Sequence, residues 1–182
     1  MYFGDQARFA FQCVIDWDVS KPNSYLFGHS CFWVDGVAVG DFSDCNILAV
    51  TVVCFEKFLE GIGKRSHSGL SGRLALEILA RVTEDTRSHK NELANCCIFQ
   101  NWGENFDSVP VGVLLEESDH QRLIWGEVQE VQTQKWTEVR EIQLPLHEFE
   151  RVIQMFLAWY KDAEQKRLPS FGQGEAGSFC IP

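Results

Sequence analysis

Histidine, cysteine and serine side chains lie close together at two places in this sequence. His29 and Cys31 would share one face of a strand, and an imidazole beside a thiol is the starting point of a cysteine nucleophile. His67 lies between Ser66 and Ser68, where a general base could activate a hydroxyl group. An enzyme that uses Cys31 or His67 is therefore one hypothesis.

The residues around these two places favour a structural role. The His67 loop lacks the Gly-x-Ser-x-Gly pattern of a serine nucleophile, and no Cys-x-x-Cys pair or close Cys/His pairs offer the four donors of a zinc centre. The glycines at 61–72 lack the Lys-Ser/Thr ending of a phosphate-binding loop, and Lys64, Arg65 and Arg73 among them read as a solvated basic loop. The sequence predicts no enzymatic activity, no cofactor and no metal site.

Composition places the protein in a reducing compartment. Seven cysteines are an odd number, and their spacing does not match a disulfide framework. The longest apolar stretch, 47–55, is far shorter than the ~20 residues that cross a bilayer. The first residues also lack the basic and apolar regions of an export signal. We expect a cytoplasmic protein that does not contact a membrane.

Carboxylates with interspersed tryptophans form the strongest candidate for a binding site. The net charge is -10, and residues 101–145 contain nine acidic and three basic side chains. On strands, alternate positions would place several carboxylates on one exposed face, which would repel nucleic acid and attract a basic protein. The predicted partner-binding residues are Glu104, Asp107, Glu116, Glu117, Asp119, Trp125, Glu127 and Glu130. The alternative is an acidic surface that only keeps the protein soluble, with the tryptophans packed inward.

Most of the elements that would position these residues follow from periodicity. Residues 8–16 alternate as a strand, and 25–42 predict an aromatic hairpin whose Asp35-Gly36 turn tolerates positive φ angles. The next element is a helix capped by Ser43 or Asp44 and ending at 61–63, although the β-branched residues 51–53 could instead mark a buried strand. The later elements are a helix after Ser71, strands at 96–100, 111–117, 122–128 and 136–144, and a long helix at 146–167.

This order of elements predicts a single α+β domain over residues 1–167. We expect a mainly antiparallel β-sheet with about three α-helices packed on it, including the long C-terminal helix. Residues 168–182 have the glycine and serine content of a tail.

The hairpin region also resembles a known family. The residues that carry the resemblance are Gly4, Phe9-Ala10, Phe27-Gly28, Cys31, Trp33-Val34, Gly36 and Gly40-Asp41-Phe42. Together they resemble the immunity protein 42 family, small bacterial proteins that neutralise a partner toxin. The chain departs from the family pattern after this triplet, where Ser43-Asp44 replaces a glycine and a small hydroxyl residue.

The resemblance implies an inhibitor with no active site of its own. Its partner would be the C-terminal domain of a cognate toxin, a basic nuclease delivered by contact-dependent inhibition or a related route. The bound inhibitor would occlude the active or substrate-binding site of the toxin. A non-inhibitory adaptor domain that recruits a basic protein is the alternative hypothesis.

Overall fold

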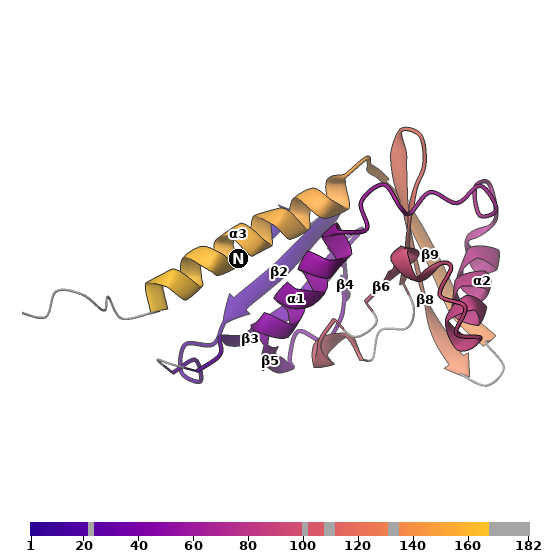
Figure 1. The fold of residues 1–182 in the computed structure, drawn as a ribbon. Helices are drawn as coiled ribbons and strands as arrows, with labels where there is room; N and C mark the ends of the chain where they lie inside the picture. The colour runs from indigo at the N-terminus through magenta and orange to yellow at the C-terminus, as the bar shows by residue number, and fades with distance from the viewer. Residues whose placement is uncertain (22–23, 100–101, 108–111, 131–134, 168–182) are drawn as a thin grey trace, which may run out of the picture.

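The computed structural model describes residues 1–21, 24–99, 102–107, 112–130 and 135–167, with side chains described throughout except at 127–130 and 135–137. Within these residues the chain forms two antiparallel sheets and three α-helices (Figure 1). The predicted α+β class, with antiparallel strands and a long C-terminal helix, is confirmed. The predicted tail at 168–182 lies outside the described residues.

The first sheet contains β1 (Tyr2–Asp5), β2 (Phe9–Ile15), β3 (Phe27–Val34), β4 (Val37–Val39) and β5 (Cys45–Ile47). The second sheet contains β6 (Cys97–Ile98), β7 (Gly112–Glu116), β8 (His120–Glu130) and β9 (Lys135–Pro145). The helices are α1 (Leu48–Leu59), α2 (Ala75–Arg87) and α3 (Glu148–Arg167), and two short 3-10 turns are η1 (Ala94–Cys96) and η2 (Glu104–Phe106). The strands therefore divide between two sheets, where the sequence indicated one.

The predicted hairpin is present, with its turn at the expected residues. Asp35 and Gly36 have φ angles of 51° and 73°, and Val34 pairs with Val37 across the turn. Positive φ at both central residues is the geometry that twists in the same sense as the flanking strands. Local sequence alone is enough to specify this part of the first sheet.

The predicted start of the first helix is wrong. The helix begins at Leu48, and Ile47 before it makes no side-chain capping hydrogen bond. Residues 45–47 instead form β5, in which Cys45 lies opposite His29 on β3. Because these three residues form a strand, Ser43 and Asp44 are separated from the first turn of the helix and cannot cap it.

An aromatic cluster fills the space between the first sheet and helices α1 and α3. Phe32 lies at its centre, with ring centroids 4.8–5.9 Å from those of seven other aromatic residues, namely Phe9, Phe11, Phe55, Phe99, Trp102, Phe106 and Phe149. A second apolar cluster packs Ile78, Leu79 and Val82 of α2 against the second sheet. Figure 1 shows α1 and α3 together over the first sheet and α2 beside the second.

Each helix in the described part of the chain is too short or too polar to cross a membrane.

Candidate partner-binding surface

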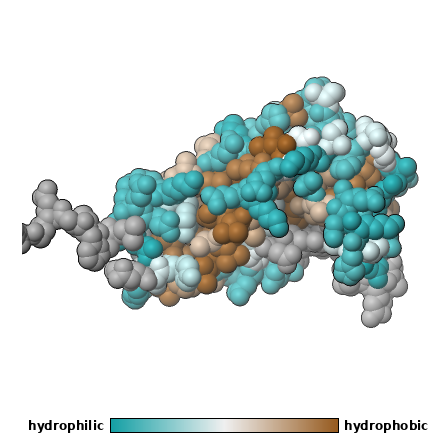
Figure 2. Space-filling view, in the orientation of Figure 1, coloured by the Kyte–Doolittle hydropathy of each residue, from teal (hydrophilic) through white to brown (hydrophobic). Residues whose placement is uncertain are grey.

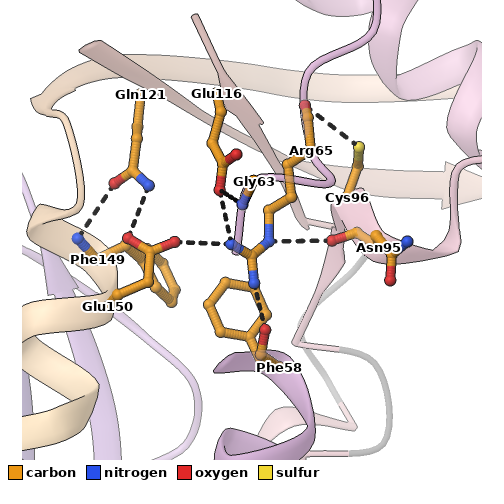
Figure 3. A network of polar contacts seen from close by, with 9 residues as sticks. All are labelled: Phe58, Gly63, Arg65, Asn95, Cys96, Glu116, Gln121, Phe149 and Glu150. Carbon is orange, nitrogen blue, oxygen red and sulfur yellow. Dashed lines mark hydrogen bonds and ion pairs between the residues drawn. The ribbon is translucent and has the colours of Figure 1, made fainter. Parts of the chain in front are cut away.

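A buried arginine connects the second sheet with α1, α3 and η1 (Figure 3). Arg65 is 0% exposed, and its Nη1 lies 2.9 Å from a carboxylate oxygen of Glu116 on β7 and 2.7 Å from one of Glu150 on α3. Its guanidinium lies 3.7 Å from the centroid of the Phe58 ring, and its other nitrogens donate to the carbonyls of Phe58 and Asn95. The expectation of a solvated loop is thus wrong for Arg65.

Further hydrogen bonds hold both carboxylates of this cluster. Glu116 accepts the backbone N–H of Gly63 at 3.2 Å. Glu150 accepts from the side-chain amide of Gln121 at 2.7 Å, and Gln121 in turn accepts the backbone N–H of Phe149 at 3.2 Å. Buried charges are tolerated only when they are paired and hydrogen-bonded in this way. Glu116 therefore has a structural role in the described fold.

The structure separates the other predicted partner-binding residues into different environments. Trp125 is 8% exposed and belongs to the main core. Glu117 is partly buried and lies 3.4 Å from Arg122. Asp119 is exposed and lies 2.7 Å from Nδ1 of His120. These residues therefore do not form a single continuous face of carboxylates and tryptophan.

The other four of the eight predicted residues are Glu104, Asp107, Glu127 and Glu130. The side chains of Glu127 and Glu130 lie outside the described ones, although their backbones belong to β8. Glu104 opens η2 and Asp107 follows it, and both are exposed.

Two aspartates from a distant part of the sequence lie on the segment next to η2. The backbone N–H of Asp41 donates to the carbonyl of Asn105 at 2.7 Å, which fixes the β4–β5 loop, with Asp41 and Asp44, against η2. No described Lys, Arg or His forms an ion pair with Asp41, Asp44, Glu104 or Asp107. Like charges without counter-ions repel one another, and a basic partner would relieve this repulsion.

Asp41 is held in its charged form by its neighbour. Both the hydroxyl and the backbone N–H of Ser43 donate to the Asp41 carboxylate, at 2.6 and 2.8 Å. These hydrogen bonds lower the pKa of Asp41, because they stabilise the ionised form.

An apolar helix face lies beside these carboxylates. Val50 and Val53 are 45% and 63% exposed, and their spacing puts them on one face of α1. Figure 2 shows hydrophobic residues gathered over α1, with hydrophilic residues around them. An exposed apolar patch with a polar rim is the usual anatomy of a protein interface.

A cavity of about 370 Å³ lies between Val50 and Glu104. Val50, Asn46, Gly103 and Glu104 are among the residues that line it. Asn46 is 6% exposed, and neither atom of its amide has a hydrogen-bond partner among the described residues. A buried amide with a free donor and a free acceptor is rare in native proteins and can pair with a peptide group of a partner. We refer to Asp41, Asp44, Asn46, Val50, Val53, Glu104 and Asp107 together as the η2 surface.

The residues considered for nucleophilic chemistry lie in other surroundings. Cys31 is buried, and desolvation raises the pKa of its thiol to about 11, whereas a nucleophilic cysteine requires a lowered pKa. Nε2 of His67 is buried and has no hydrogen-bond partner among the described residues, so no described serine or carboxylate orients it.

The fold and the η2 surface together define a small α+β protein with a preformed surface of the kind that protein-binding proteins present. The chain belongs to the immunity protein 42 family, because the model of that family matches residues 1–159. The family predicted from the hairpin residues is thus confirmed.

This chain is similar in fold to a solved structure. It is the crystal structure of CdiI from Burkholderia dolosa AUO158, with a TM-score of 0.67 and 17% sequence identity. The match covers 87% of this chain and 99% of that chain, so the two share the same fold over almost their whole length. No curated protein matches this sequence.

Proposed function

We propose that this protein is an immunity protein that binds a cognate toxin domain and neutralises it. Membership of the immunity protein 42 family is the observation that carries the proposal. The similarity in fold to a protein named CdiI supports a role in contact-dependent inhibition. The described cysteines form no disulfide bond, which fits a protein that meets the toxin in the cytoplasm.

The toxin domain is a basic nuclease, and the bound immunity protein occludes its active or substrate-binding site. Support comes from the net charge of -10 and from the unpaired carboxylates of the η2 surface, which can occupy a cleft built for phosphates. In this proposal Glu104 and Asp107 contact the toxin directly. Asp119, Glu117, Glu127 and Glu130 contribute at longer range by attracting a basic partner. Glu116 and Trp125 act from inside the fold, by maintaining the shape of the second sheet.

Co-expression with the toxin domain encoded by the neighbouring gene tests this function. We expect the two chains to co-purify and the host cells to survive induction of the toxin. A complex without protection would support the adaptor alternative. Absence of both the complex and the protection would refute the proposal.

The acidic part of the η2 surface makes a kinetic prediction. The double variant Glu104→Lys/Asp107→Lys is expected to associate with the toxin at least about tenfold more slowly at low salt, because rim charges mainly set the association rate. The difference should shrink at high salt, where exposed charges are screened. Stopped-flow fluorescence at several salt concentrations measures both effects.

A matched variant separates local from overall charge. Glu84 and Glu92 are exposed and lie outside the η2 surface, on α2 and just before η1. The variant Glu84→Lys/Glu92→Lys has the same net charge as the first and should slow association much less. Equal slowing by both pairs would show that the η2 surface has no special part in the encounter.

A further inference from the structure

Three metal-ligand side chains from separate segments converge on the face of the first sheet opposite the aromatic cluster. Asp16 follows β2, His29 lies on β3 and Cys45 lies on β5. One donor atom from each lies within 4.8 Å of the other two. Asp16 and His29 lie outside the η2 surface, whereas Cys45 also lines its cavity.

The sheet fixes the backbone positions of this triad. His29 pairs directly with Cys45 on one side and with Val14 on the other. Directly opposed residues project to the same face, with Cβ atoms about 5 Å apart. The backbone N–H of Asp16 donates to the carbonyl of Phe27 at 2.9 Å, which holds the end of β2 against β3. The donors are therefore brought together by ladder hydrogen bonds and not by a flexible loop.

Asp16 is also oriented at the level of its side chain. Its Oδ1 accepts the backbone N–H groups of Asp18 at 3.0 Å and Val19 at 3.3 Å, and no described hydrogen bond is made by Oδ2. Hydrogen bonds of this kind orient metal-ligating carboxylates. One oxygen is positioned by the turn, and the other remains for a ligand.

The imidazole of His29 has an unsatisfied nitrogen. Nδ1 is buried and lacks a hydrogen-bond partner among the described residues, and the ring lies 6.0 Å from the Phe42 ring. Buried polar atoms without a hydrogen-bond partner are rare and call for an explanation, and the binding of an ion is one such explanation. This observation is independent of the closeness of the three donors.

We propose that Asp16, His29 and Cys45 bind one divalent transition metal ion, and that Zn²⁺ is the preferred ion. Nitrogen, sulfur and carboxylate oxygen are the donors that Zn²⁺ takes in proteins, and water fills the fourth tetrahedral position. The charges balance, since one thiolate and one carboxylate neutralise the ion while the imidazole stays neutral. Cys45 is exposed, so the ion can enter from solvent, and its thiol proton is released to water as the metal–sulfur bond forms.

Sequence spacing could not reveal this site. The three donors lie 13 and 16 residues apart and match no metal-binding motif. The sequence contains no set of metal donors that are close in sequence, and this is the basis of the expectation of no metal site. Convergence here depends on the pairing of β5 with β3, which was not expected.

Titration of the full chain with Co²⁺ tests the proposal, because a cobalt–thiolate bond gives a charge-transfer absorption band that other ligands do not. We expect one ion per chain and displacement of Co²⁺ by Zn²⁺. The variants Cys45→Ser, Asp16→Asn and His29→Gln should each lower the affinity at least about tenfold, and Cys45→Ser should abolish the band. Far-UV circular dichroism tests whether each variant is folded. If His29→Gln is unfolded, the affinities of Cys45→Ser and Asp16→Asn for Co²⁺ test the proposal.

Matched controls identify the thiol. Cys54 on α1 and His120 on β8 do not belong to the group of donors that lie within 4.8 Å of one another, and Cys180 lies outside the described residues. Cys54→Ser, His120→Gln and Cys180→Ser should therefore bind Co²⁺ as the unsubstituted chain does. The proposal is overturned if Cys45→Ser keeps the band, or if the unsubstituted chain binds no Co²⁺. Because the readout needs no toxin, its outcome is separate from that of the proposed function.

Discussion

The variant Arg65→Met is expected to lower the free energy of unfolding by about 3–5 kcal/mol, measured by urea denaturation. The substitution leaves two carboxylates, those of Glu116 and Glu150, buried without a cation. It also removes the donors to the carbonyls of Phe58 and Asn95 and the contact with the Phe58 ring. Methionine keeps much of the side-chain volume, so the loss reports the charge and the hydrogen bonds and not a cavity.

Two further variants make this prediction specific. Arg73 is 46% exposed and lies 3.7 Å from Glu77, so Arg73→Met should change stability by less than about 0.5 kcal/mol. The triple variant Arg65→Met/Glu116→Gln/Glu150→Gln should recover part of the loss, because it removes the uncompensated charges. A loss for Arg65→Met as small as that for Arg73→Met would contradict the role given to the buried cluster.

The variant Val53→Arg is expected to weaken toxin binding at least about 30-fold, or about 2 kcal/mol. It places a long cation beside Val50 on the exposed side of α1, where it would repel a basic partner and prevent close packing. Val53 is 63% exposed and arginine is a good helix former, so the fold should be unaffected. Isothermal titration calorimetry against the purified toxin domain measures the effect.

Leu76→Arg provides the matched control for this substitution. Leu76 is 51% exposed on α2, outside the η2 surface, so it tests the same change in size and charge elsewhere. We expect its affinity to remain within about threefold of the unsubstituted chain, as for most residues outside an interface core. If Val53→Arg binds as well as Leu76→Arg while the complex still forms, the toxin contacts another surface and the immunity function stands.

The elements that follow from local sequence were predicted well. Asp35-Gly36 specifies its own turn, and the apolar stripe of α3 repeats over several helical turns. β5 escaped prediction because its three residues form a strand only through pairing with β3. The interaction that decides their conformation lies in another part of the chain, which local periodicity does not report.

The candidate surface was predicted in part for the same reason. Glu116 reads as an outward carboxylate until Arg65, 51 residues earlier, is brought into contact with it. Glu104 and Asp107 lie in the acidic segment that the sequence singled out, but Asp41 and Asp44 join them only through the contact of the β4–β5 loop with η2. Charge counts along the sequence detect an acidic segment, whereas they cannot detect which carboxylates are neutralised by a distant cation.

One side of α1 packs in the core, and the other side is exposed. Leu48, Thr51, Phe55 and Phe58 face the interior, whereas Val50 and Val53 face outward. Mutations on the outer side can therefore accumulate while the scaffold is conserved, so the partner preference of such a protein can diverge quickly within one fold. An evolutionary change of toxin would then require only new side chains on a helix that is already anchored.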